Sequence, residues 1–411
     1  MPRVLQINST ANWGSTGKIA EQINATASSL GWETYIAYGR IANPSSSKLI
    51  HIGNKLSQLL ALIGTRLFDN EGLFSIGVTY AFIHKIKKIN PDVVHLHNIH
   101  GYYLNIKILF SYLNKMGIPI VWTLHDCWAF TGHCPHFDYI KCERWKKQCY
   151  SCPQKNDYPT SWCMDGSKRN YRIKKKYFNL PSNLILVPIS QWLDKVVANS
   201  FLSSKKRVVI NNGVDINKFH YCEPNHINTL GLIGKYVLLG VATTWLDKKG
   251  LSDYFLLSDM LDSQYQIVLI GLSEKQISSL PPKIIGIKRT SSIEELIEYY
   301  SIADVVMNLS YEESFGLTTV EGMACGTPGI VYDRTASPEL ITKQTGIVVT
   351  AGDLKSVTKA VEVICSKGKS FYQDACRNRA IEYYDKNIQY QKYINLYSEL
   401  MKKNGNRLSN A

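Results

Sequence analysis

Short, continuously apolar segments alternate with helical segments along nearly the whole chain, and this alternation limits the possible folds more than any other feature. Residues 4–8 and 92–97 are typical of these segments. Strands of this kind, without a polar face, are expected in parallel sheets covered on both sides. Because the chain has 411 residues, we expect two domains rather than one. We therefore predict an α/β protein with two doubly wound, Rossmann-like domains that face each other across a cleft.

The expected elements divide the chain into two series. In the first series we expect helices at 18–30, 102–115 and 191–200, and strands at 4–8, 34–38, 92–97, 118–124, 184–189 and 207–211. In the second we expect helices at 251–261, 292–301, 317–325 and 354–365, and strands at 236–242, 266–270, 284–287, 305–308 and 329–331. Polar residues 223–234 are the expected linker. We predict an N-terminal domain at 1–215, a C-terminal domain at 230–385, and a segment at 386–411 that packs back on the N-terminal domain as a helix.

Composition and charge narrow the class of protein. Hydrophobic residues make up 45% of the chain, which excludes a mainly disordered protein. The apolar stretches 59–64 and 73–83 are shorter than the ~18 residues of a membrane-spanning helix, and no signal-peptide pattern opens the chain. We expect a cytoplasmic protein. The formal net charge is +14, and residues 141–176 hold 11 Lys and Arg against three acids, as expected for a solvated face or for contact with an anionic partner.

A glycine-containing turn follows the first expected strand. Gly14-Ser15-Thr16-Gly17 leads from that strand into a helix, whose first backbone amides are able to meet an anion. The spacing does not fit a P-loop, and it does not contain the three glycines of a dinucleotide fingerprint. A plain strand-to-helix turn explains it equally well.

The most informative segment is 308–328, NLSYEESFGLTTVEGMACGTP. It begins at the carboxyl end of an expected strand, where ligands bind in open α/β sheets. Glu313 precedes a helix and Glu321 lies within it, while residues 315–318 offer backbone amides and the positive end of the helix dipole to a diphosphate. Gly326 and Pro328 end the helix. Without this context, two such acids would be read as ordinary surface residues.

This segment resembles the E-x7-E motif of retaining GT-B glycosyltransferases, a large family that includes sucrose and glycogen synthases and many bacterial exopolysaccharide and lipopolysaccharide enzymes. Other pieces follow in the family's order. Residues 212–215, Asn-Gly-Val-Asp, resemble its turn before the interdomain linker, and Lys249 stands where the family has a phosphate-binding lysine. The family usually has an arginine five residues earlier, but this chain has Thr244, for which Lys248 is a candidate substitute. His125 resembles the family's active-site histidine.

The resemblance implies transfer of a hexosyl group from a nucleotide-diphosphate sugar, with retention and without a required metal. It implies catalytic roles for His125, Glu313 and Lys249. Glu313 would hold the sugar, Glu321 the ribose, and Gly17 would close over the diphosphate. The implied donor site comprises Gly17, Lys248, Lys249, Glu313, Phe315, Gly316, Leu317, Thr318 and Glu321.

A cysteine-rich insertion at about 127–163 directly follows His125. The spacing of its cysteines predicts a structural zinc site at Cys134, Cys142, Cys149 and Cys152, with free or disulfide-prone thiols as the alternative. A similar insertion with the sequence Trp-Ala-Phe-Thr-Gly occurs in a subset of bacterial exopolysaccharide glycosyltransferases. The aromatic residues of the insertion in this chain are suited to stacking on sugar rings, and its lysines are suited to binding an anionic membrane surface. These aromatic residues are Tyr139, Trp145, Tyr150, Tyr158 and Trp162.

His95, His97 and His100 lie at the end of an expected strand. Metal binding is one interpretation, but we favour histidines of the core or cleft.

We therefore expect a peripheral enzyme of the inner membrane face that extends a saccharide or lipid-diphosphate-linked acceptor in surface polysaccharide synthesis. One alternative is a GT-B-like nucleotide-sugar epimerase, which needs no acceptor. The other is a nucleic-acid-binding protein that uses the basic cysteine-rich segment, and it leaves Glu313 without a role. We expect no nucleic-acid partner.

Overall fold

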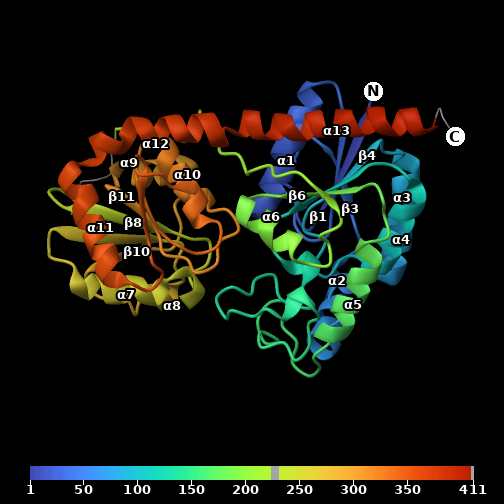
Figure 1. Cartoon of the computed structure of the whole chain (residues 1–411), viewed down its shortest axis with the longest axis horizontal. Helices are drawn as coiled ribbons and strands as arrows, with labels where there is room; N and C mark the ends of the chain where they lie inside the picture. Colours follow the sequence, from blue (N-terminus) through green and yellow to red (C-terminus); the bar gives the residue numbers. More distant parts are fainter. Residues whose placement is uncertain (224–230, 409–411) are drawn as a thin grey trace. The chain divides into compact units, whose positions relative to one another are not determined.

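The computed structural model describes residues 1–223 and 231–408, with side chains described up to residue 403. The chain forms two compact units (Figure 1). Unit 1 comprises Met1–Asn211 and Gln389–Ala411, and unit 2 comprises Asn212–Ile388. Residues 224–230 of the expected linker lie outside the described residues. Within the described ranges, no helix has both the length and the apolar character needed to cross a bilayer.

Unit 1 contains a parallel sheet that has seven strands among the described residues, in the order β3-β2-β1-β4-β5-β6-β7. The strands are β1 (Arg3–Asn8), β2 (Glu33–Tyr38), β3 (Lys48–His51), β4 (Val93–Leu96), β5 (Ile120–Leu124), β6 (Leu184–Pro188) and β7 (Lys206–Arg207). The helices of this unit are α1 (Gly14–Ser29), α2 (Lys55–Phe68), α3 (Ile76–Ile89), α4 (Ile106–Met116), α5 (Ser167–Phe178) and α6 (Gln191–Ala198). The strand order reverses direction between β1 and β4, and this switch point is where α/β sheets bind ligands.

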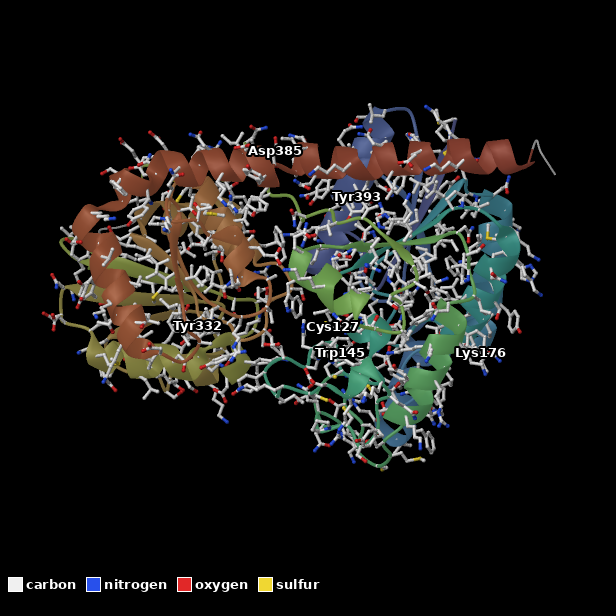
Figure 2. The ribbon with its side chains drawn as sticks, in the orientation of Figure 1. Cys127, Trp145, Lys176, Tyr332, Asp385 and Tyr393 are labelled. Atoms are coloured by element: carbon white, nitrogen blue, oxygen red, sulfur yellow. The ribbon has the colours of Figure 1, made fainter. Side chains whose placement is uncertain are left out.

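Both faces of the first sheet are covered. On one face, Val4, Val93 and Val121 pack against Ile23 of α1 and against aromatic side chains of α13 (Lys386–Leu408). Tyr393 is one of these aromatic residues and is labelled in Figure 2. On the other face, Trp122 of β5 packs against Phe110 of α4 and Phe178 of α5. Burial on both sides explains why these strands lack a polar face.

Unit 2 repeats this plan with six parallel strands among the described residues, in the order β10-β9-β8-β11-β12-β13. The strands are β8 (Tyr236–Val241), β9 (Tyr265–Ile270), β10 (Ile284–Ile287), β11 (Val305–Asn308), β12 (Gly329–Tyr332) and β13 (Gly346–Val349). The helices are α7 (Leu251–Met260), α8 (Glu274–Ile277), α9 (Ile293–Ile302), α10 (Leu317–Ala324), α11 (Leu354–Lys367) and α12 (Lys369–Tyr384). Two sheets with this strand order confirm the predicted pair of Rossmann-like domains.

Several expected boundaries were wrong. The first helix begins at Gly14 rather than at residue 18, so Gly17 lies inside the first turn of α1 and not in a loop. The strand expected at 207–211 is only Lys206–Arg207. Strands β3 and β13 and helices α2, α3, α5, α8 and α12 were not anticipated.

Candidate functional site

The acidic motif of unit 2 lies at the carboxyl end of β11, beside the lysines that follow β8. Lys249 Nζ donates to Glu313 Oε2 at 2.8 Å and to the Glu312 carbonyl at 3.0 Å. Lys248 Nζ lies 3.5 Å from the carboxylate of Glu312, and the Lys248 carbonyl accepts from the amide of Tyr311. Both predicted lysines are therefore joined to the motif that contains Glu313.

Gly250 makes this close approach possible. Its φ is +77°, and a Cβ atom at this position would lie 2.2 Å from the Leu309 carbonyl oxygen. A larger residue would push the lysine-bearing turn away from the end of β11. Gly316 has a comparable role: its φ is +100°, and a Cβ atom there would lie 2.9 Å from Leu340 Cδ1.

The predicted anion-binding helix is present as α10, with Gly316 as its N-cap. The first amides of a helix have no partner within that helix, so those of Leu317 and Thr318, both half-buried, begin a positively polarised end. Phe315 is buried and packs edge-on against Tyr384, so its side chain supports the turn from within the unit. The backbone around Phe315, rather than its ring, is the part suited to contact a ligand.

Glu321 lies within α10, eight residues after Glu313. Its Oε2 accepts from the hydroxyl of Tyr300 at 2.8 Å. Burial, and then Glu321 itself, raise the pKa of Tyr300 well above its usual value, so the phenol stays protonated and donates to the carboxylate. Tyr300 thus holds Glu321 in one orientation, a role that the sequence did not reveal.

In unit 1, three histidines meet at the carboxyl ends of β4 and β5. His97 Nδ1 lies 3.0 Å from His125 Nε2, and the rings of His95 and His97 lie 4.0 Å apart. Burial lowers the pKa of His95 and of His97 well below the usual value, and it lowers the pKa of His125 to about 4. All three rings are therefore neutral at pH 7. The expectation that His95, His97 and His100 are core or cleft residues is confirmed, since each is buried.

The hydrogen-bond network sets the tautomer of His125. Gln6 Nε2 donates to the Ala20 carbonyl and to Asn24 Oδ1, which leaves Gln6 Oε1 to accept from His97 Nε2 at 2.5 Å. The neutral His97 ring then has Nδ1 as its acceptor, and that atom receives the Nε2 proton of His125. The lone pair of His125 is consequently on Nδ1, which is able to accept a hydrogen bond from a hydroxyl group.

Asp126 supports the segment beside His125. Its two carboxylate oxygens accept from the amide of Trp128 at 2.8 Å and from His100 Nε2 at 3.1 Å. Burial favours the neutral acid, but the neighbouring His100 and these hydrogen bonds lower the pKa of Asp126 to about 2. Residues 97–100 and 122–126 line a common pocket in this unit.

Gly17 is buried in the first turn of α1. A Cβ atom would lie 2.7 Å from Thr10 Oγ1, and the Gly17 carbonyl accepts from the amide of Asn12. Gly17 therefore lets the segment between β1 and α1 fold tightly onto the helix. Its predicted contact with a diphosphate stays a prediction.

The cysteine-rich insertion, which we call the lobe (residues 127–163), has an aromatic core of its own. Trp145 is buried and stacks on Phe137 at 4.7 Å and packs near Phe130. The interpretation of Trp145 as a sugar-stacking residue was therefore wrong, because its ring is enclosed by the lobe. Tyr139, Tyr150, Tyr158 and Trp162 are exposed.

The four cysteines expected to bind zinc, Cys134, Cys142, Cys149 and Cys152, line one pocket of the lobe. A hydrogen bond joins Cys134 and Cys152, raising the pKa of the Cys134 thiol and lowering that of Cys152 to about 7. In the described part of the chain, however, no three His, Cys, Asp or Glu side chains are arranged to hold a metal ion. The zinc site stays a prediction.

Comparison with known proteins identifies the family. Residues 234–383 match the family described as "Glycosyl transferases group 1", and residues 61–218 match "Glycosyltransferase Family 4". The chain belongs to the family 4 glycosyltransferases. This is a retaining family whose members are typically metal-independent. The expected identity is thereby confirmed.

Two curated relatives resemble this glycosyltransferase. A "Putative colanic acid biosynthesis glycosyl transferase WcaC" from Escherichia coli K12 is 26% identical over 227 residues, which are 52% of this chain and 55% of the relative. An "N,N'-diacetylbacillosaminyl-diphospho-undecaprenol alpha-1,3-N-acetylgalactosaminyltransferase" from Campylobacter jejuni is 24% identical over 50% of this chain and 57% of the relative. The chain thus spans about half the length of each relative.

Solved structures confirm the GT-B fold of this glycosyltransferase. Sucrose-phosphate synthase from Thermosynechococcus elongatus has a TM-score of 0.74 at 16% identity, covering 98% of this chain and 100% of that one. Anabaena Alr3699/HepE in complex with UDP-glucose has a TM-score of 0.62 at 13% identity, covering 100% of both chains. At these identities the likeness concerns the fold alone.

Proposed function

We propose that this family 4 glycosyltransferase transfers a hexosyl group from a nucleoside diphosphate sugar, with retention, to a lipid-diphosphate-linked saccharide during assembly of a surface polysaccharide. The observation that carries the donor half is the cluster at the end of β11, where Lys249 pairs with Glu313 beside the N-terminus of α10. Family membership favours glycosyl transfer over the epimerase and nucleic-acid-binding alternatives.

The cluster suits departure of a nucleoside diphosphate. Negative charge grows on the diphosphate as the bond to the sugar breaks, and fixed positive groups lower the barrier by meeting that charge. In this proposal Lys249 and the first amides of α10 supply those groups, and Lys248 adds a second ammonium in place of the arginine absent at Thr244. Glu313 positions the sugar hydroxyls.

Glu321 binds the ribose in this proposal. A carboxylate accepts two hydroxyl hydrogen bonds well, and Tyr300 already fixes its orientation. The UDP-glucose named for the HepE structure makes UDP the first nucleotide to test.

His125 contacts the donor sugar or the acceptor in this proposal. Its Nδ1 lone pair suits a hydroxyl donor, and a ring that is neutral at pH 7 does not repel the oxocarbenium-like charge that develops on the sugar. The acceptor assignment draws on the diphospho-undecaprenol named for the Campylobacter relative and on the basic segment 141–176 of this chain.

A nucleotide-binding screen tests the part of the proposal that concerns the sugar donor. Wild type, Glu321→Ala and Glu362→Ala, an exposed acid on α11, are heated with UDP, GDP, ADP, CMP and their common sugars. At a hundredfold excess over Kd, a ligand should stabilise the native protein by about 2.7 kcal/mol. We expect one nucleoside diphosphate to stabilise wild type and Glu362→Ala but not Glu321→Ala. No response from folded wild type to any nucleotide would contradict the proposal.

A further inference from the structure

Helix α2 of unit 1 exposes most of its large apolar side chains and buries most of its small ones. Leu56, Leu59, Leu60 and Ile63 are 64%, 50%, 57% and 46% exposed, whereas Ala61, Gly64 and Thr65 are buried. The spacing of the four exposed residues places them on one face of the helix. We call this set the α2 apolar face. Helices of ordinary soluble domains bury such a face, so this one needs a partner.

The orientation of α2 is fixed by the rest of the unit. A Cβ atom on Gly64 would lie 2.0 Å from the ring of Phe74. The face of the helix that bears the small residues is therefore packed against the interior of the unit. A capping box between Asn54 and Ser57 holds the N-terminus. At the C-terminus, Asp69 accepts from buried His133 at 2.7 Å and from the amide of Gly166. The α2 apolar face therefore cannot turn inward without breaking these contacts.

Two more apolar side chains lie at the end of α2, Trp162 of the lobe and Met164, which directly follows the lobe. Trp162 and Met164 are 66% and 50% exposed. Their amides donate to the carbonyls of Arg66 and Leu67, and the Arg66 guanidinium lies 5.9 Å from the centre of the Trp162 ring. A tryptophan at the edge of an aliphatic surface is typical of proteins that contact the membrane interface.

The helices of this part of the unit contain basic residues and no acids. The sequences of α2, α3 and α5 contain no Asp or Glu. Helix α5 lies beside α2 (Figure 1). Arg169 of α5 joins the end of α2, because its Nη2 donates to the Phe68 carbonyl at 2.9 Å. The exposed bases of α5 are Lys168, Arg169, Arg172, Lys175 and Lys176. Apolar side chains bordered by lysine and arginine match the chemistry of an anionic lipid surface.

We propose that the α2 apolar face docks unit 1 on an anionic lipid bilayer. Its aliphatic side chains enter the headgroup region, and the bases of α2 and α5 meet lipid phosphates. A second copy of the chain fits less well, because pairing these faces would bring two basic surfaces together in a protein of net charge +14. This inference rests on the proposed function, since a lipid-linked acceptor would have to be reached from a membrane surface.

Vesicle sedimentation tests the proposal with a matched control. The test variant is Leu59→Glu with Ile63→Glu on α2. The control is Leu256→Glu with Met260→Glu on α7, a pair with the same spacing that is 56% and 43% exposed. Vesicles are made of phosphatidylcholine alone or with phosphatidylglycerol. We expect wild type and control to bind the anionic vesicles, less at high salt, and the α2 variant to bind at least ~10-fold more weakly. Unchanged circular dichroism shows that each variant is folded.

Three results would overturn docking on lipid. The first is that wild type does not bind anionic vesicles. The second is that the α2 variant binds them as well as wild type does. The third is that wild type does not bind vesicles but forms a dimer, and that the α2 substitutions abolish this dimer. Nucleotide-induced stabilisation is measured on the same samples, because that site lies in unit 2. Vesicle binding without a nucleotide response would refute the proposed donor but not the docking, and the reverse pattern would refute only the docking.

Discussion

His97 Nδ1 lies 3.0 Å from His125 Nε2, and Gln6 on the far side of His97 determines which ring donates. His97 is thus a positioning residue for His125, because it fixes the tautomer without needing to touch a substrate. The pair joins the ends of two neighbouring strands, β4 and β5.

Replacing His97 tests this role. In His97→Phe, the Nε2 proton of His125 loses its acceptor, at a cost of ~1–3 kcal/mol, and we expect kcat to fall about 5- to 150-fold. His97→Gln offers an amide oxygen and an amide nitrogen, so it should restore part of the rate. Stabilisation by a nucleotide, which we propose to occur in unit 2, should not change in either variant. His84→Phe, an exposed site on α3, is the control. Equal kcat values for His97→Phe and wild type would show that His97 does not contribute to catalysis.

Stability should fall in mild acid because buried histidines resist protonation. The folded pKa of His125, about 4, lies below the usual histidine value of 6.5, so between these values the unfolded chain binds the proton and the native protein does not. The free energy of unfolding should therefore decrease as pH falls from 6.5 toward 4, by about 1.4 kcal/mol per pH unit for one group. Denaturant titrations from pH 7 to pH 5 measure this, and His125→Asn should reduce the slope. An equal slope for wild type and His125→Asn would show that this ring does not account for the pH dependence.

Lys249 should matter mainly in the transition state. In Lys249→Met, the developing diphosphate charge loses one ammonium, and we expect a ~2.7–4 kcal/mol higher barrier, or ~10²–10³ in kcat. Lys248→Met should cost less, since its ammonium lies 3.5 Å from Glu312 rather than in the short contact with Glu313. Lys359→Met on α11 is the control. Comparable losses of kcat in Lys248→Met and Lys249→Met would mean that Lys248 fully replaces the arginine absent at Thr244.

The lobe should contain one zinc ion per chain. Cys134, Cys142, Cys149 and Cys152 line one pocket, and four cysteine thiolates are a ligand set that binds zinc in structural sites. Elemental analysis of protein purified without chelator measures the content. We expect Cys149→Ser with Cys152→Ser to lose the zinc and to expose the lobe to proteases. Cys163→Ser, at an exposed cysteine, should keep both properties. If wild type contains no metal and its lobe is intact, the zinc site is refuted and the alternative of free or disulfide-prone thiols remains.

Sequence reasoning predicted most strands because burial on both faces makes them continuously apolar. It failed for β3 (Lys48–His51), an edge strand with three exposed residues and no apolar run. It also missed α2, because the stretch 59–64 stands out in the sequence only as an apolar segment too short to span a membrane. Most of the large apolar residues of α2 face outward, so the usual relation between an apolar pattern and the protein interior does not hold there.

The candidate site was predictable where its signal is local in sequence. Glu313, Glu321 and the start of α10 belong to one short motif, and α10 begins where that motif indicates. Gln6, His97 and Tyr300 act through partners that are brought close by the order of strands β1, β4 and β5 or by the packing of α9 on α10. No spacing within the sequence encodes those partners.

The core of unit 1 requires residues from both ends of the chain. Tyr390, Tyr393 and Tyr397 of α13 pack with Val4 and Val93, and the hydroxyl of Tyr397 lies 2.5 Å from His95 Nδ1. On the ribosome, the first 211 residues therefore emerge without the helix that completes their core, whereas unit 2 emerges as one continuous segment. At about 5–20 residues per second, the interval between Asn211 and Gln389 is about 9–36 s. Unit 2 is thus able to close before unit 1 during synthesis, and the surface around His95 stays uncovered until α13 is made.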